Sequence, residues 1–147
     1  MTMTVSSTAF ADGGVIPRRH TCDGEDLSPP MSFADVPSGT KELALLVEDP
    51  DAPGGTFVHW LIWDLPARAR ALREGMAKAR HLDDGAKQGI NGYGTIGWSG
   101  PTQASDTAEM QSSSVTVHIL WLGGHSTGLR PVPAYQRGRR SDYAYRP

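Results

Sequence analysis

The stretch that decides the fold is Glu48-Asp49-Pro50-Asp51-Ala52-Pro53-Gly54-Gly55-Thr56-Phe57-Val58-His59-Trp60. It joins two apolar runs, at 43–47 and 57–63, through a short polar turn that holds two carboxylates and two prolines. Each proline disfavours the helical conformation in the residue before it, and the glycine pair then allows the chain to reverse. We therefore predict a stiff loop that presents Asp49 and Asp51 at the end of two strands, where small-molecule sites are commonly built.

Length and composition narrow the class of protein. The chain has 147 residues, of which 38% are hydrophobic and 20% charged, and this is typical of one globular domain. A net charge of -2 argues against non-specific nucleic-acid binding, which needs a basic face. The single cysteine, Cys22, cannot form an internal disulfide, so a reducing cytosol is the default expectation. Without a signal-peptide pattern or a long apolar run, we expect a cytoplasmic protein with no transmembrane segment and no nucleic-acid partner.

The two apolar runs predict the central strands. Both are bounded by turns and apolar throughout, which is typical of strands buried on both faces. Strict alternation along the second run places His59 on one face and Trp60 on the other. The residues expected beside His59 are Phe57, Leu61 and Trp63, and those expected beside Trp60 are Val58 and Ile62. We expect Trp60 and Trp63 to lie in the core, as large aromatic residues usually do.

The rest of the chain adds shorter elements. Further strand candidates are 8–16, 31–33 and 115–122, and residues 17–31 are predicted to form a loop because Pro29 and Pro30 remove backbone donors. Residues 67–80 have a helix-favouring composition that is interrupted by Gly75. Residues 123–147 show no pattern of a buried element. Together the patterns predict an all-β or β-rich sandwich with a few short helices.

Two candidate motifs are weighed against simpler explanations. His20, Cys22, Asp23 and Asp26 are metal-ligand types at close spacing, but no second Cys/His pair stands at a recognised spacing, so a solvated loop is favoured. Gly92 and Gly94 lack the strand-then-helix context of a nucleotide-binding motif. We therefore predict no metal and no cofactor, and we expect the glycines to allow close approach of the backbone to a strand or a ligand.

Several blocks of the chain, in order over residues 9–101, resemble the phosphatidylethanolamine-binding protein family, and especially its bacterial branch, described as Raf-kinase-inhibitor-like. The blocks are Cys22-Asp23-Gly24 with Leu27-Ser28-Pro29-Pro30, then Asp49-Pro50-Asp51-Ala52-Pro53, then His59-Trp60, then Asn91-Gly92-Tyr93-Gly94 with Gly97-Trp98-Ser99-Gly100-Pro101. The resemblance implies a single domain over 1–147, folded as an antiparallel β-sandwich (Greek-key-like) with a few short peripheral helices. It favours irregular structure over a helix at 67–80.

The resemblance also implies a small anion-binding pocket at one end of the sandwich. Its expected ligand-binding residues are Asp49, Asp51, Pro53, His59, Trp98, Gly100 and Pro101. A histidine can donate a hydrogen bond and become cationic when an anion approaches. Amide N–H groups around 98–100 could face a phosphate or carboxylate.

For three of these residues a structural role is weighed beside the ligand role. Asp49 and Asp51 would orient His59, bind the ammonium of an ethanolamine-like head group, or hold the loop through backbone N–H groups. On its own, a histidine in an apolar strand is more often a core residue with a satisfied hydrogen bond, and the resemblance raises the ligand role for His59.

The resemblance ends after Pro101. Residues 102–114 are polar and lack the expected prolines, no His-x-Tyr follows, and His118 does not match the family's second histidine. We hypothesise a frameshift after Gly100. Residues 117–124 can be encoded by codons that, shifted by one base, read Phe-Thr-Phe-Tyr-Gly-Leu-Glu, a string that resembles the family's missing strand. Sequencing this stretch of the gene tests the hypothesis. As the chain stands, 115–122 can supply the missing strand, with alternate residues on one face. Those residues are Val115, Val117, Ile119 and Trp121.

Three classes of function follow. The first is non-enzymatic binding of small anions or phospholipid head groups, such as phosphate or phosphoethanolamine. The second is a protein-interaction module that inhibits a kinase or protease, as implied by some relatives. The third is an acid–base enzyme that uses Asp49 or Asp51 with His59, for which no clear nucleophile is present. We rank them in this order and expect no enzyme activity; the natural ligand, the partner and the oligomeric state do not follow from the sequence.

Overall fold

Antiparallel pairing of short and long strands builds the whole described structure. The computed structural model describes residues 3–11, 15–50, 55–101, 115–123, 130–132, 134–136 and 139–141. The strands are β1 (Thr4–Ser6), β2 (Met31–Ala34), β3 (Thr40–Asp49), β4 (Phe57–Pro66), β5 (Ala71–Leu72), β6 (Lys87–Gln88), β7 (Thr116–Gly123), β8 (Arg130–Val132), β9 (Ala134–Gln136) and β10 (Arg139–Ser141). A single 3-10 turn, η1 (Arg18–His20), accompanies them in the described ranges.

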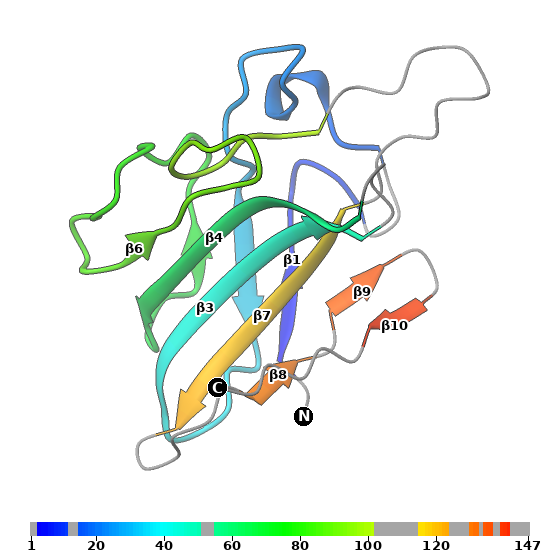
Figure 1. The fold of residues 1–147 in the computed structure, drawn as a ribbon. Coiled ribbons are helices and arrows are strands. Elements are labelled where there is room, and N and C mark those ends of the chain that lie inside the picture. The colour runs from blue at the N-terminus through cyan, green and yellow to red at the C-terminus, as the bar shows by residue number, and fades with distance from the viewer. Residues whose placement is uncertain are drawn as a thin grey trace.

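The strands form two facing sheets and a separate pair (Figure 1). The larger sheet has the order β6-β4-β3-β7-β8, and the smaller has the order β1-β2-β5. Strands β9 and β10 pair with each other. Every strand pair is antiparallel, and β3 lies at the centre of the larger sheet. The predicted antiparallel β-sandwich is therefore confirmed.

The core lies between the two sheets. Strand β3 contributes alternate side chains that are 0–1% exposed, and β4 contributes their cross-strand partners. The smaller sheet covers them with side chains from β2 and β5 and with Met3. The main members are Met3, Met31, Phe33, Leu43, Leu45, Val47, Trp60, Ile62, Leu65, Leu72 and Ile119. Burial of this apolar surface is the main stabilising term of the fold.

A β-bulge interrupts the alternation of β4 at His59. Val47 pairs with Trp60 and Glu48 pairs with Val58, so His59 is the extra residue between them. A bulge re-aims the side chains around it. The rings of both His59 and Trp60 contact Trp98, with centroids 6.2 and 5.9 Å away. The strict alternation predicted along 57–63 is therefore interrupted at His59, where the extra residue shifts the phase of the strand.

Strand β7 fills the place beside β3 that the sequence left in doubt. It pairs with β3 over most of its length, and its alternate residues pack on the core as predicted. These are Val115, Val117, Ile119 and Trp121. On the opposite face, His118 Nε2 lies 2.9 Å from Glu48 Oε1, and both side chains are buried. A buried acid–histidine pair thus joins the two strands.

Other expectations are corrected. The predicted strand at 8–16 is absent from its described residues, and the N-terminal strand is β1 at 4–6. Residues 67–80 hold only the two-residue β5 and no helix, so the helix propensity was misleading and the irregular structure implied by the resemblance is found. The carbonyls of Ala77 and Ala79 instead accept from Gln88 Nε2, at 2.6 and 2.8 Å. Strands β8, β9 and β10 lie within residues 123–147. Trp60 is fully buried as predicted, but Trp63 is only partly buried.

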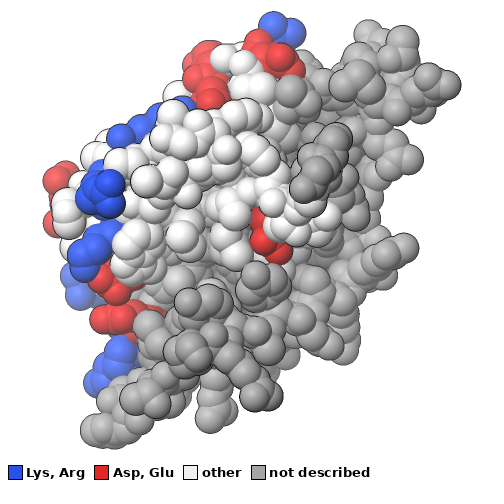
Figure 2. All heavy atoms as spheres, viewed as in Figure 1, with Lys and Arg blue, Asp and Glu red and all other residues white. Residues whose placement is uncertain are grey.

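Charged side chains gather at the edges of the described surface. In Figure 2 they follow the edge that carries β6 and the end near η1, whereas the area over β4 and β3 is largely uncharged. At the β6 edge Lys87 forms an ion pair with Asp64. In the ranges that the structure describes, no helix is long and apolar enough to cross a membrane.

Candidate functional site

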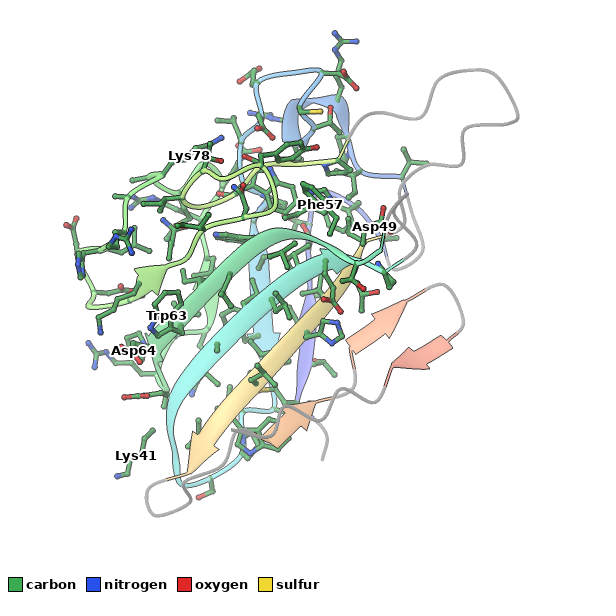
Figure 3. The ribbon with its side chains drawn as sticks, in the orientation of Figure 1. Lys41, Asp49, Phe57, Trp63, Asp64 and Lys78 are labelled. Carbon is green, nitrogen blue, oxygen red and sulfur yellow. The ribbon has the colours of Figure 1, made fainter. Side chains whose placement is uncertain are left out.

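The β3–β4 hairpin brings the first candidate residues to one end of the larger sheet. Asp49 ends β3 and pairs with Phe57, the first residue of β4. Figure 3 shows both at one end of the hairpin, with Trp63 and Asp64 at the other. Asp49 is buried, at 7% exposure. Asp51 and Pro53, which were also predicted to bind ligand, lie outside the described residues.

His59 is held in a fixed orientation at this end. Its Nδ1 lies 2.8 Å from the carbonyl oxygen of Ser99. A carbonyl only accepts, so Nδ1 carries the proton, and in the neutral ring Nε2 carries the lone pair. No hydrogen bond to Nε2 is formed within the described part of the chain. One ring nitrogen of His59 is therefore satisfied inside the fold, as expected of a core histidine, and the ligand-binding role of His59 stays a prediction.

Burial lowers the pKa of His59 below its usual value of 6.5. The bond to Ser99 O and the carboxylates of Asp49 and Asp26 oppose this effect and favour the charged ring, but burial is the larger cause. His59 is therefore mostly neutral at pH 7, and a further negative charge placed beside Nε2 would favour its protonation.

The loop at 98–101 is clamped to the turn at η1. Trp98 Nε1 donates to the carbonyl oxygen of His20 at 3.1 Å, and the amide of Cys22 donates to the carbonyl of Pro101 at 3.1 Å. A Cβ built on Gly100 would lie 2.0 Å from the His20 carbonyl oxygen, so glycine is required there by close packing. Trp98, Gly100 and Pro101 are all buried, and they form one wall beside His59.

The amides of this wall do not face outward as the sequence suggested. Ser99 N–H donates to the carbonyl of His59 at 3.0 Å, and Gly100 N–H donates to Asp26 Oδ1 at 2.7 Å. The expectation that these two N–H groups face an anion is therefore wrong, because both are used to hold the loop. Among the described residues, the side chain of His59 is one polar group of this region that could meet an anion.

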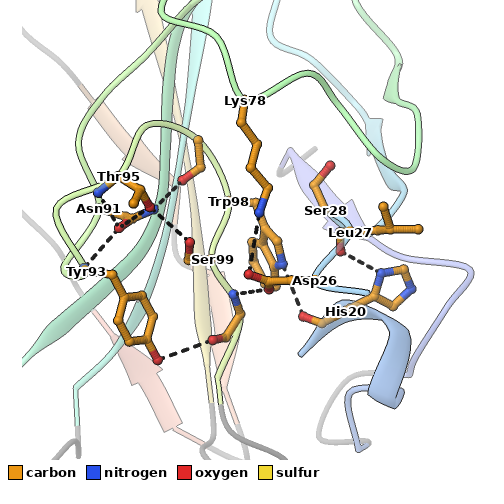
Figure 4. A network of polar contacts seen from close by, with 12 residues as sticks. His20, Asp26, Leu27, Ser28, Lys78, Asn91, Tyr93, Thr95, Trp98 and Ser99 are labelled. Carbon is orange, nitrogen blue, oxygen red and sulfur yellow. Dashed lines mark hydrogen bonds and ion pairs between the residues drawn. The ribbon is translucent and has the colours of Figure 1, made fainter. Parts of the chain in front are cut away.

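Two site residues were missed from the sequence. Tyr93 stacks edge-on against Phe57 with centroids 4.7 Å apart, lies 6.4 Å from the ring of His59, and is half exposed. Its hydroxyl donates to the carbonyl of Gly100 at 3.4 Å (Figure 4). Asp26 was considered only as a metal ligand, yet it bonds Gly100 across 74 residues of chain. The blocks that carry the resemblance contained Tyr93 but not Asp26, and no local spacing predicts such long-range contacts.

Burial is the largest cause that raises the pKa of Tyr93, and the neighbouring Cys22 and the carboxylates of Asp26 and Asp23 add to the effect. The phenol therefore remains protonated and keeps donating to Gly100. Cys22 itself is exposed. Tyr93 thus closes the outer side of the wall.

Asn91 shapes the loop that carries Tyr93. Its Nδ2 donates to Thr95 Oγ1 (2.8 Å) and to the carbonyl of Gly97 (2.9 Å), and its Oδ1 accepts from Tyr93 N–H (2.9 Å). Thr95 Oγ1 in turn lies 3.2 Å from Ser99 Oγ. A buried amide with this many partners acts as a rigid hub. Because the Ser99 hydroxyl belongs to this network, it is not presented as a nucleophile.

The metal site considered from the sequence does not assemble. His20 Nδ1 donates to the carbonyl of Leu27 at 2.9 Å, and Asp26 is engaged with Gly100 and Lys78. Among the described residues, no three His, Cys, Asp or Glu side chains are grouped closely enough to hold a metal ion.

Comparison with known proteins gives consistent relatives. The chain is 48% identical over 99 residues to the UPF0098 protein of Aquifex aeolicus. The matched stretch covers 67% of this chain and 57% of that protein. It is 46% identical over 103 residues to the UPF0098 protein of Methanothermobacter thermautotrophicus, and this match covers 70% of this chain and 68% of that protein. The chain thus spans little more than half the length of the Aquifex relative.

Two solved structures are similar. One is described as a putative phosphatidylethanolamine-binding protein homolog, CT736, from Chlamydia trachomatis, with a TM-score of 0.65, 33% identity, and coverage of 83% of this chain and 74% of that one. The other is E. coli YbcL, described as a member of the mammalian PEBP family, with a TM-score of 0.64, 28% identity, and coverage of 82% and 74%. The pattern of the phosphatidylethanolamine-binding protein family matches residues 6–112. The chain therefore belongs to the phosphatidylethanolamine-binding protein family.

Proposed function

We propose that this protein binds small anions or phospholipid head groups, of the phosphate or phosphoethanolamine kind, at His59, and that it does so without catalysing a reaction. The observation that supports this proposal is the orientation of the His59 ring. The carbonyl oxygen of Ser99 fixes Nδ1, and no hydrogen bond to Nε2 is formed within the described part of the chain. A ring that is already oriented needs no reorganisation when a ligand arrives, which favours binding.

The charge balance suits a ligand with a phosphate and an ammonium. A phosphate beside Nε2 favours the imidazolium form, which then donates a charge-assisted hydrogen bond. The carboxylate of Asp49 already acts on His59, and it would attract a cationic group on the same ligand while repelling a bare anion. Phosphoethanolamine is therefore expected to bind more tightly than phosphate. The family name supports the same head group.

The test is calorimetric titration with phosphate and with phosphoethanolamine at pH 6. His59→Asn is the informative variant, because its amide can still donate to Ser99 O but has no atom in the place of Nε2. A lost hydrogen bond to a charged ligand is worth about 1.5–3 kcal/mol, so affinity should fall about tenfold or more. His81→Asn, at an exposed histidine, is the matched control and should bind normally. Equal affinities for all three proteins would refute the proposal.

The proposal that this protein binds its ligand without catalysing a reaction is tested separately. Within the described residues, Ser99 Oγ is engaged with Thr95 and His59 Nδ1 is engaged with a backbone carbonyl, so no base–nucleophile pair is assembled. Phosphorus NMR of phosphoethanolamine incubated with the protein should show the ligand unchanged after hours. Release of inorganic phosphate above the rate in buffer would contradict this part.

A further inference from the structure

The carboxylate of Asp26 connects three segments that are far apart in the sequence. Its Oδ1 accepts from the amide of Gly100 at 2.7 Å, and its Oδ2 accepts from Lys78 Nζ at 3.4 Å. Asp26 itself has a positive φ of 56°, a conformation that costs energy for a residue with a Cβ. Figure 4 shows the carboxylate between Lys78 and the wall beside Trp98. A strained residue held by two long-range bonds points to a specific role.

Gly100 is held through both of the peptide groups that flank it. Asp26 takes the N–H of Gly100, and the Tyr93 hydroxyl donates to the carbonyl oxygen of the same residue at 3.4 Å. Behind Gly100 lies the His20 carbonyl, so the residue cannot retreat. Within the described part of the chain the Gly100 N–H has no hydrogen-bond partner besides Asp26, so loss of that bond frees this side of the residue.

We propose that Asp26 is a positioning residue of the His59 site. Its carboxylate fixes the wall at Gly100 and Pro101 and connects this wall to the segment that contains Lys78. This inference rests on the proposed function. Neither the family match nor the comparisons assign a role to Asp26.

The charge of Asp26 has a second consequence. Among the described residues, the charged groups that act on His59 are Asp49, from β3, and Asp26, and both favour the protonated ring. The rings beside His59 are Phe57, from its own strand, and Tyr93 and Trp98, from the loop at 89–101. Of these rings only Tyr93 titrates, and it stays protonated. Removing the charge of Asp26 should therefore lower the pKa of His59 further and move anion binding to lower pH.

The experiment separates the hydrogen bond from the charge. Asp26→Asn can keep the bond to Gly100 N–H but loses the charge, whereas Asp26→Ala loses both. Three quantities are measured for each: hydrogen exchange of the Gly100 amide, the pKa of His59 by NMR, and the affinity for inorganic phosphate from low to neutral pH. Asp23→Asn, a carboxylate in the same loop that is not among the charges acting on His59, is the control.

The expected pattern differs between the variants. In Asp26→Ala the Gly100 amide should exchange about tenfold faster or more, the factor that corresponds to a lost bond to a charged acceptor. Its phosphate affinity should fall even at a pH where His59 is fully protonated. In Asp26→Asn the exchange and the low-pH affinity should stay near wild type, while the His59 pKa falls and the binding curve shifts to lower pH. Asp23→Asn should leave the His59 pKa and the phosphate affinity unchanged.

Two results would overturn the inference. One is an Asp26→Ala protein with unchanged Gly100 exchange; the other is an Asp26→Ala protein that matches Asp26→Asn in low-pH affinity, since the bond would then have no role in positioning. Because Asp26→Asn is isosteric, it remains informative if Asp26→Ala does not fold. Failure of the wild-type protein to bind phosphate or phosphoethanolamine would instead refute the proposed function, and the Gly100 exchange and the His59 pKa would still decide the role of Asp26.

Discussion

Replacement of Gly100 by alanine should break the clamp between the loop at 98–101 and the turn at η1. The backbone of Gly100 does not have a positive φ in this structure, so alanine adds no conformational strain there. The added Cβ would instead lie 2.0 Å from the His20 carbonyl oxygen and 3.0 Å from Thr21 Cα. Both atoms belong to the backbone, and one of the two segments must therefore move.

The magnitude follows from what that movement disrupts. Overpacking of a close contact costs about 1–3 kcal/mol. Separation of the two segments also weakens the bonds from Trp98 Nε1 to His20 O and from Cys22 N to Pro101 O, each worth about 0.5–1.5 kcal/mol. We expect the free energy of unfolding to fall by about 2–4 kcal/mol, a large share of the 5–15 kcal/mol typical of a domain.

Urea unfolding followed by tryptophan fluorescence measures this change, because Trp98 lies in the clamp itself. Gly94→Ala is the matched control: it lies in the neighbouring loop, has open space around its Cβ position and a φ of +80°, and so should cost only the conformational penalty of about 1 kcal/mol. If Gly100→Ala destabilises the protein no more than Gly94→Ala, the clamp does not hold the wall as described.

The remaining predictions concern pH and two buried networks. Burial lowers the pKa of His59 in the folded state, so the unfolded chain takes up the proton first on acidification. The free energy of unfolding should therefore fall as the pH drops below 6.5. Urea titrations at several pH values measure this dependence, and His59→Asn should flatten it. Glu48→Leu removes the buried carboxylate that contacts His118 Nε2, so thermal unfolding should show a loss of about 1–3 kcal/mol, and an unchanged midpoint would argue against this contact between β3 and β7. Asn91→Ala should cost about 1–3 kcal/mol and accelerate exchange of the Tyr93 amide, whereas equal exchange would remove the hub role of Asn91.

Much of the fold could be predicted from the apolar runs. The runs at 43–47 and 57–63 lie in β3 and β4, and the alternate apolar residues of 115–122 identified the core-facing side of β7. The helix propensity of 67–80 failed because Gln88 takes the carbonyls of Ala77 and Ala79 in a tertiary contact that propensity does not include.

The site was only partly predictable for a similar reason. The resemblance indicated His59 and the wall at Trp98, Gly100 and Pro101, and the structure brings these residues together. It did not indicate the bulge, which depends on the pairing of β4 with β3 and turns His59 and Trp60 toward the same tryptophan. Nor did it indicate that Asp26 takes the Gly100 amide, since that bond joins positions 74 residues apart.

The most direct test of the central claim is NMR of the imidazole nitrogens of His59 during titration with phosphoethanolamine. Nδ1 already carries a proton, which it donates to the carbonyl oxygen of Ser99, so its signal should change little. The Nε2 signal should move toward the protonated value and saturate with the ligand, and the pKa of the ring should rise from its lowered value. A His59 ring that shows no change at saturating phosphoethanolamine would contradict the assignment of this residue as the ligand-binding group.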